Sequence, residues 1–454
     1  MPITGPAVWI KDPLAILADR AERGVVVAAG RIVELVAAGR APVTPNVSVL
    51  EAGEHVVLPG LINTHHHFYQ TLTRAVPAAL DRELFPWLEA LYPVWARLQP
   101  EALELATMAA MAELLLSGCT TTTDHHYVFP PGLEHAIDIE VSVAKRLGMR
   151  VLLTRGSMNR SRRDGGLPPD SVVQDEATIL ADSKRLIERF HETGEGARVQ
   201  IALAPCSPFS VTTSLMRSTA ELAERTGVRL HTHLGETEDE NRYCLEVHGC
   251  RPLDYLGDCG WLNERTWLAH GIHFNQSEMK RLAQARTSIS HCACSNQTLA
   301  SGCCPVCDLE QAGVRVGIGV DGSASNDGSN LMQEARAAFL LQRARYGVGR
   351  VSHRDALRWV TQGSAGCIGR PELGEIATGK MADLALFKLD ELRFSGHGDP
   401  LAALVLCGAH RADWVMVGGD WVVERGEIPG LDIADLMRRH SAAARAMQGH
   451  GAGI

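Results

Sequence analysis

The sequence predicts an α/β protein, a (β/α)8 TIM-like barrel with a small β-sandwich domain built from both chain termini. Two observations carry this prediction. Short apolar runs alternate with helical patterns over roughly 300 residues in the middle of the chain, which is typical of parallel strands joined by helices. Both ends instead carry branched-aliphatic runs separated by glycine turns. The 454-residue length suits a large barrel with one small additional domain.

Both ends of the chain carry strand-like patterns. The segment VVVAAGRIVELV (25–36) has a glycine turn between two strand-like runs, and ADWVMVGGDWVVERGE (412–427) is divided by Gly-Gly into a probable hairpin. ADLALFKL (382–389) is a further strand-like run near the C-terminus. We therefore expect three parts: 1–58 as the N-terminal part of the β-sandwich domain, 59–370 as the barrel, and 371–454 as the C-terminal part of the β-sandwich domain.

Between these ends the eight predicted barrel strands follow one another. Helical patterns lie between several of them, for example at 100–118 and 214–227. The apolar runs are 56–63, 118–124, 150–156, 198–205, 229–234, 266–270, 287–291 and 315–321.

Composition excludes several classes of function. Hydrophobic residues make up 45% and charged residues 21%, as in globular proteins, and the net charge of −9 argues against a nucleic-acid-binding surface. No run reaches the roughly 18 apolar residues needed to cross a bilayer. The N-terminus lacks a basic-then-apolar leader, so the twelve cysteines are expected to be reduced in a cytoplasmic protein.

Metal-ligand residue types stand at the ends of successive predicted strands. In a barrel these ends converge on one face, where active sites are built. The residues are His65, His66 and His67 after the first strand, His231, His233 and Glu236 at the fifth, His270 at the sixth (with His273 just beyond), His291 at the seventh and Asp321 at the eighth.

Strand alternation sorts the histidines. His65 and His67 share one side while His66 points the other way, and His231 pairs with His233 by the same argument. A single HxH pair is weak evidence for a metal, His291 alone is more simply a structural histidine, and Asp321 alone could be a turn or cap residue. Their common position at the strand ends nevertheless favours a metal site with an open position for water or substrate.

At these residues the chain resembles a known family. PGLINTHHH, HTHLGET, LAHGIHF, HCACSN and GVDGSASND are similar to motifs of the amidohydrolase superfamily, in its purine, pyrimidine and triazine deaminase branch. The resemblance covers nearly the whole chain and implies hydrolytic removal of an amino group from an N-heterocycle. It implies metal ligands at His65, His67, His233, His270 and Asp321, and catalytic roles for Glu236 as acid/base, His291 toward water or substrate, and Asp321 as proton acceptor.

The same resemblance bears on the metal. Members with two ions usually bridge them with a lysine on the fourth strand, and RVQIALAP (198–205) contains none, so one divalent ion is expected, Zn²⁺ or alternatively Fe²⁺. CCPVC (303–307) resembles the cysteine part of an unrelated zinc deaminase signature, but its proline precedes Val-Cys and no H-x-E accompanies it. We expect no metal there.

The longer runs PGLINTHHHFYQTLTRA and ELLLSGCTTTTDH are most similar to enzymes of this branch that act on 8-oxoguanine. The resemblance places Gln70 on the amide-like edge of the substrate. Arg155 and Asn159 are further candidate substrate contacts in TRGSMNRSRRDGG (154–166), although a solvated loop is an equal alternative.

Guanine or isocytosine deamination and hydroxy-s-triazine (alkyl)aminohydrolysis stay open as alternative activities. The expected partner is a small nucleobase-like molecule, and a homodimer is expected from the family alone.

Overall fold

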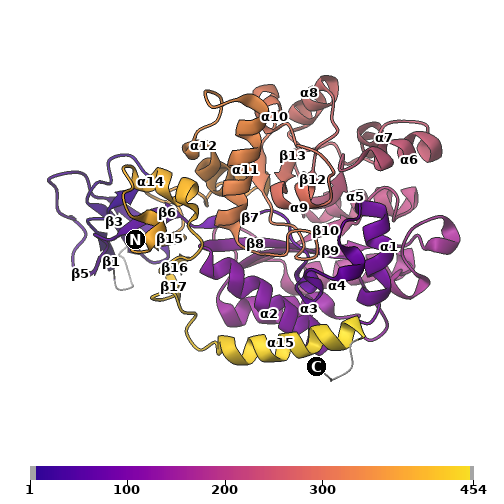
Figure 1. The fold of residues 1–454 in the computed structure, drawn as a ribbon, viewed down its shortest axis with the longest axis horizontal. Coiled ribbons are helices and arrows are strands. Elements are labelled where there is room, and N and C mark those ends of the chain that lie inside the picture. Colours follow the sequence, from indigo (N-terminus) through magenta and orange to yellow (C-terminus); the bar gives the residue numbers. More distant parts are fainter. Residues whose placement is uncertain (1–6, 450–454) are drawn as a thin grey trace.

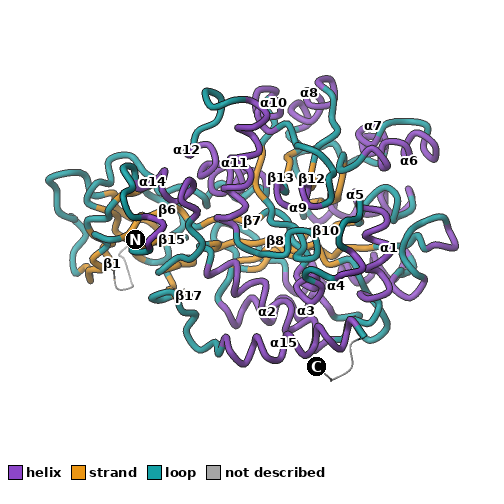
Figure 2. Tube along the Cα trace, viewed as in Figure 1, coloured by secondary structure: helices purple, strands orange, loops and turns teal. Residues whose placement is uncertain are grey.

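The structure, a computed structural model, describes residues 7–449, so the first six residues of the segment predicted at 1–58 and the last five of the segment predicted at 371–454 lie outside it. Eight parallel strands form one sheet in sequential order from β7 to β14, and helices surround them (Figures 1 and 2). The strands are β7 (Leu61–Asn63), β8 (Cys119–His126), β9 (Arg150–Ser157), β10 (Val199–Pro205), β11 (Leu230–Leu234), β12 (Thr266–His270), β13 (Ser288–His291) and β14 (Val316–Ile318). Each matches one predicted apolar run, so the predicted barrel is confirmed.

The first and last strands meet where the sheet closes. Thr64 donates its backbone N–H to Ile318 O (3.0 Å), and Asp321 donates its own to His65 O (3.1 Å). Closure therefore places the residues that follow β7 directly beside those that follow β14, although they are far apart in sequence.

Helices connect the strands and cover the outside of the barrel. They are α1 (Leu84–Trp95), α2 (Pro100–Leu116), α3 (Ala136–Leu147), α4 (Glu176–Phe190), α5 (Thr213–Thr226), α6 (Glu238–His248), α7 (Pro252–Asp258), α8 (Gln276–Ala285), α9 (Ala293–Thr298), α10 (Val306–Ala312), α11 (Leu331–Tyr346), α12 (His353–Arg358) and α13 (Ser364–Cys367). The short 3-10 helix η1 (Phe68–Thr73) follows the histidine triplet directly.

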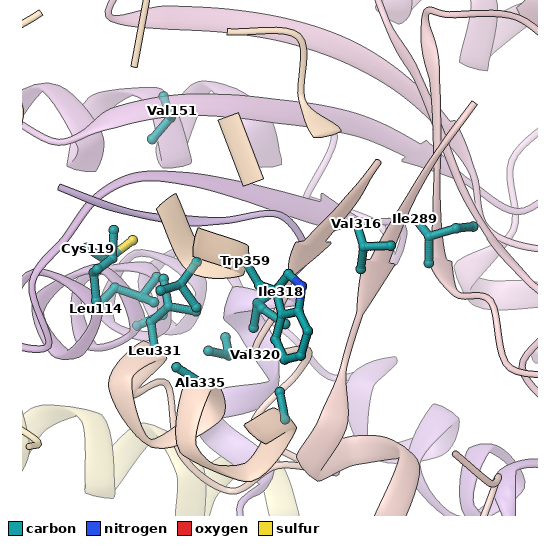
Figure 3. Packing of buried hydrophobic residues seen from close by; sticks show 14 of the residues in the cluster. Leu114, Cys119, Val151, Ile289, Val316, Ile318, Val320, Leu331, Ala335 and Trp359 are labelled. Carbon is teal, nitrogen blue, oxygen red and sulfur yellow. The ribbon is translucent and has the colours of Figure 1, made fainter. Parts of the chain in front are cut away.

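The largest core cluster lies between the barrel strands and these helices. Figure 3 shows Val316 and Ile318 of β14 and Leu331 of α11 within it, together with Trp359 from the π-helical turn Trp359–Gly363. A smaller cluster, which includes Ile62, Leu152, Ala202 and Trp267, fills the barrel interior. The barrel interior is thus filled with side chains, and an active site can be built only at the end where the strands terminate.

Both chain ends contribute to the separate β structure on one side of the barrel (Figure 1). Side chains of its two sheets share one apolar cluster, which includes Ile10 and Val27 from the first sheet and Val57 and Leu386 from the second. One sheet has the order β4-β3-β1-β5 (Arg31–Leu35, Gly24–Ala28, Ala7–Lys11, Val47–Glu51), and the other β17-β16-β15-β6-β2 (Asp420–Val423, Trp414–Val417, Leu384–Lys388, His55–Pro59, Ala15–Ile16). The expected β domain of mixed origin is therefore present.

The C-terminal part differs from the prediction that 371–454 as a whole completes this domain. The short α14 (Pro400–Ala403) and the π-helical turn Leu404–Gly408 pack near α11 and α12, and α15 (Ile433–Gln448) runs along α2 at the barrel (Figure 1). His440 of α15 hydrogen-bonds Thr71 (Nε2 to Oγ1, 3.0 Å), and Gln448 donates to Leu72 O (2.8 Å). The last helix therefore braces η1 and the histidine triplet before it.

We expect acid to weaken the contact between His440 of α15 and Thr71, and so to lower the free energy of unfolding. Burial and nearby Arg74 lower the pKa of His440 to about 4, below its unfolded value of roughly 6.5. The unfolded chain therefore binds this proton first, and the contribution of neutral His440 is lost as pH falls from about 6.5 to 4, by about 1–2 kcal/mol after allowance for partial exposure. Thermal unfolding of wild type and His440→Gln at pH 7.5 and 5 tests this. The variant should lose less stability on acidification, and an equal loss would contradict the assignment.

Candidate metal centre and active site

Five predicted ligands meet at the strand ends. The Nε2 atoms of His65 and His67 each lie 3.3 Å from Asp321 Oδ1, and His67 Nε2 lies 3.2 Å from His233 Nε2. His270 Nε2 is 3.9 Å from Asp321 Oδ2. A tetrahedral zinc ion with bonds of about 2.0–2.2 Å would hold its ligand atoms roughly 3.3–3.6 Å apart. The spacings of His65, His67 and His233 are close to that range and His270 lies somewhat further from Asp321, so the donor atoms are grouped closely enough to share one ion.

Hydrogen bonds fix which ring nitrogen of each histidine carries the proton. Carbonyl groups only accept, so His67 Nδ1, 2.7 Å from His125 O, and His233 Nδ1, 2.6 Å from Cys206 O, must carry hydrogens. Their Nε2 atoms then hold lone pairs that face each other at 3.2 Å, which is repulsive unless a cation lies among them. The donor set thus fits a divalent metal ion.

His65 obtains the same tautomer through a relay. His231 Nδ1 donates to Trp267 O (2.8 Å), so its Nε2 accepts from His65 Nδ1 (2.7 Å) and His65 Nε2 keeps a lone pair for the ion. His270 Nδ1 lies 2.9 Å from Asn296 Oδ1. Such outer contacts orient ligand imidazoles. His231 therefore orients His65 and uses both of its own ring nitrogens in doing so.

Local environment sets the charges of the ligands. Burial lowers the pKa of His65, His67 and His233, which keeps their rings neutral and able to bind a metal. Burial opposes ionisation of Asp321, but His65 beside it holds the pKa of that carboxyl well below its ordinary value. Neutral imidazoles and one carboxylate leave net attraction for a cation.

Two of the predicted ligands occupy strained backbone. His270 (φ 73°) and Asp321 (φ 64°) lie in the left-handed region, which side-chain-bearing residues seldom adopt. Both stand where a barrel strand ends and the chain turns, so the turn aims the side chain over the barrel mouth. Such strain is characteristic of functional sites.

Glu236 lies beside this centre, just after β11. Its Oε2 is 3.6 Å from His270 Nε2, and the N–H groups of Gly235 and Glu236 donate to Glu240 Oε2 (2.6 and 3.1 Å). Burial raises the pKa of Glu236 to about 7. A carboxyl group with that pKa can hold and release a proton near neutral pH, as a general acid/base must.

His291 is fully buried at the end of β13, and neither of its ring nitrogens has a hydrogen-bond partner among residues 7–449. Burial lowers its pKa to about 3, so the ring is neutral. A buried polar ring without a protein partner is costly unless a bound group satisfies it. The role of His291 toward water or substrate stays a prediction, and its unpartnered ring leaves both nitrogens available for one.

A cavity opens over the predicted ligands. Gln70, on η1, lines it, and its Oε1 is buried without a partner among the described residues. A Cβ atom at Gly322 would lie only 1.9 Å from this oxygen, so the glycine after Asp321 makes room for the amide. Apolar side chains from α1 form one wall, with Phe209 nearby: Leu84, Trp87, Leu88 and Tyr92. A flat ring with an amide-like edge suits such a lining.

Arg155 and Asn159 are not brought to this cavity. Arg155 points outward from β9, pairs with Asp182 (2.9 Å) and lies over the Phe129 ring (4.0 Å). Asn159 exchanges hydrogen bonds with Thr212, the N-cap of α5 (2.8 and 2.9 Å). The geometry gives both residues a structural role in place of the predicted substrate contact.

The remaining histidines also have structural partners. His66 accepts the His67 N–H at Nδ1 (2.8 Å) and bonds Ser329 Oγ at Nε2 (2.9 Å), so it faces away from the centre as predicted. His273 bonds Ser301 O (2.9 Å) and Glu238 (2.9 Å). Within the described chain, all twelve cysteines are free. The groups of side chains there that are spaced closely enough to hold a metal ion do not include Cys303, Cys304 or Cys307.

Sequence reasoning missed some residues around the site. His125, at the end of β8, groups with His65 and His233 within ligand distance, and its Nδ1 has no partner among residues 7–449. Tyr127 and Cys206 line the cavity. His125 follows the second predicted strand as the other ligands follow theirs, so its position at a strand end was the available signal.

Fold and site together define a hydrolase built on a (β/α)8 barrel, with side chains at its mouth that could hold a metal ion. The Amidohydrolase family matches residues 56–422, and this chain belongs to that family. It is 62% identical to the 8-oxoguanine deaminase of Pseudomonas aeruginosa, over 97% of this chain and 98% of the relative. It is 36% identical to hydroxydechloroatrazine ethylaminohydrolase of Pseudomonas sp. strain ADP, over 86% and 83%.

A solved structure supports the assignment of the fold and bears on the metal. The zinc complex of the atrazine chlorohydrolase TrzN from Arthrobacter aurescens TC1 superposes with a TM-score of 0.90 at 29% identity, covering 96% of this chain and all of that one. Among the described residues of the present protein, helices long and apolar enough to span a membrane are absent.

Proposed function

We propose that this protein hydrolyses 8-oxoguanine to urate and ammonia. The observation that carries the proposal is the 62% identity to a named 8-oxoguanine deaminase across nearly the full length of both chains. The site offers the matching chemistry. The predicted metal ligands, Glu236 with its raised pKa and the unpartnered amide oxygen of Gln70 all face one cavity. Guanine or isocytosine deamination and triazine aminohydrolysis stay alternatives with weaker support.

The proposed ion is a single catalytic Zn²⁺, with Fe²⁺ as the alternative, held by His65, His67, His233, His270 and Asp321. When bound, a divalent ion supplies Lewis-acid activation of water near neutral pH. Support for zinc comes from the donor types and from the zinc complex of the structural neighbour. The homodimer and the cytoplasmic location stay predictions from the sequence.

Two side chains, Glu236 and Asp321, carry out the proton transfers. Glu236 holds a proton and delivers it to the ring nitrogen beside the amine-bearing carbon, so that charge does not accumulate on the ring during attack by water. Asp321 accepts one proton from that water and passes it to the amino group, which leaves as ammonia. The second proton of the water goes to Glu236 as the carbonyl forms, which restores the carboxylic acid. Gln70 orients the amide-like edge of the base, and His291 hydrogen-bonds the attacking water or the substrate.

Ammonia release tests the substrate assignment. Zinc-loaded protein is given 8-oxoguanine, guanine, isocytosine and a hydroxy-s-triazine in parallel, with metal-stripped protein as the control. We expect kcat/KM for 8-oxoguanine to exceed the others by at least about 100-fold, because a site with buried polar groups strongly rejects rings that leave them unpaired. Faster turnover of another ring would move the assignment to that ring, and no ammonia from any would overturn the proposal.

A further inference from the structure

A second group of metal-type side chains lies on the outer side of β8. Asp124 and His126 alternate with His125, so they point away from the catalytic centre toward α3, where Glu140 meets them. The side chains of His126 and Glu140 are fully buried, and Asp124 is 0% exposed. Their potential ligand atoms lie within 4.8 Å of one another. The proposed reaction uses none of the three.

Hydrogen bonding leaves this group incomplete. His126 Nε2 donates to Val128 O (2.8 Å), which places the lone pair of the neutral ring on Nδ1. That atom is 3.2 Å from Glu140 Oε1, yet the two are not aligned as a hydrogen bond. Asp124 Oδ1 accepts the Phe68 N–H (2.7 Å), but Asp124 Oδ2 and both Glu140 oxygens have no partner among residues 7–449. Four buried ligand-type atoms therefore converge. Burial raises the pKa of Glu140 to about 8, so without a cation the two carboxyl groups would share a proton.

Within residues 7–449, the nearby cationic side chain does not neutralise the two carboxyl groups. Arg155 is the nearby cation, and it is committed to Asp182 (2.9 Å) and Gln174 (2.7 Å). Burial lowers the pKa of His126 to about 4, so an imidazolium does not supply the charge. Buried carboxylates of this kind are paired, protonated or bound to a metal.

We propose that Asp124, His126 and Glu140 form a second metal site, structural in role, for a divalent first-row ion such as Zn²⁺. A histidine whose other nitrogen donates to a backbone carbonyl is the arrangement seen in the catalytic ligands His67 and His233. The donors are one nitrogen and carboxylate oxygens, which suit such an ion. The ion would tie β8 to α3 and, through Asp124 and the Phe68 N–H, steady the residue next to His67.

Metal content of the intact protein tests the site without any variant. Protein produced with added zinc is measured by elemental analysis before and after dialysis against dipicolinate. We expect two ions per chain, falling to about one when activity is lost, because the enclosed site exchanges far more slowly than the one that opens to the cavity. An anomalous difference peak at the zinc edge between β8 and α3 would agree. One ion at the start, with no peak there, overturns the proposal in favour of a shared proton.

Variants locate the second ion. Glu140→Gln should lower the content from two ions to one while the catalytic ion remains, and Glu278→Gln is the matched control. Glu278 is also a buried helical glutamate, but it pairs with Arg251 (2.7 Å) and belongs to no metal-type group among the described residues. Two ions retained in Glu140→Gln would contradict the site. Failure of the proposed substrate to react would not, since metal content is measured independently of turnover.

Discussion

Replacement of Glu236 by glutamine is expected to lower kcat for 8-oxoguanine by about 10³-fold, within the range that a positioned acid/base contributes. The amide keeps the size of the side chain but cannot transfer the proton to the ring nitrogen. Because the structure places Glu236 beside His270 (3.6 Å) and not among the closest ligand contacts, zinc content should stay at the wild-type level. Steady-state kinetics with metal analysis of the same preparations measures both quantities.

Glu238→Gln is the control for this substitution. Glu238 lies two residues further along, at the first position of α6, but its side chain is 65% exposed and contacts His273 outside the cavity. We expect its kcat to match wild type within about twofold, as for surface substitutions away from a site. If Glu236→Gln kept more than a tenth of the wild-type kcat with full zinc, another group would have to move the proton.

Much of this site could be predicted because barrel topology converts sequence position into spatial position. Residues that end successive parallel strands must meet at one face, so the sequence alone groups His67, His233 and Asp321. Strand alternation then separated His66 from its neighbours. Neither inference needed the shape of a loop.

The predictions that differ from the structure needed information that alternation alone lacks. Arg155 has the same parity on β9 as Val151 and Leu153, which face the helices, whereas Leu152 faces the barrel interior. Had it been known that Leu152 faces the barrel interior, strand alternation would have predicted that the Arg155 side chain points outward. Asn159 instead links the loop after β9 to Thr212 at the start of α5. Such a contact depends on where the chain turns after the strand.

The C-terminal helix shows a second limit. The pattern of α15 is amphipathic, with Leu436 and Met447 buried, but an apolar helical face does not reveal which surface it covers. The β runs that precede it suggested the β domain. The structure instead places it along α2, where it reaches Thr71.

The histidine triplet provides a matched pair for the metal assignment. His67→Gln should weaken zinc binding by at least about 100-fold, more than the loss of an outer contact, and activity should fall with it. His67 contributes an unprotonated Nε2 3.3 Å from Asp321, and an uncharged amide is a poor substitute for that donor. Zinc affinity from competition with a chromogenic chelator measures the change.

His66→Gln should leave zinc affinity within about threefold of wild type. Both nitrogens of His66 are already used by the protein, one by the His67 N–H and one by Ser329, and a glutamine can still offer an acceptor and a donor there. Adjacent residues of identical chemistry would thus differ in zinc affinity by more than an order of magnitude. Equal losses in the two variants would mean that the triplet acts as a buried unit whose packing, rather than one lone pair, holds the ion. Only a difference between them can be assigned to the direction in which each ring points.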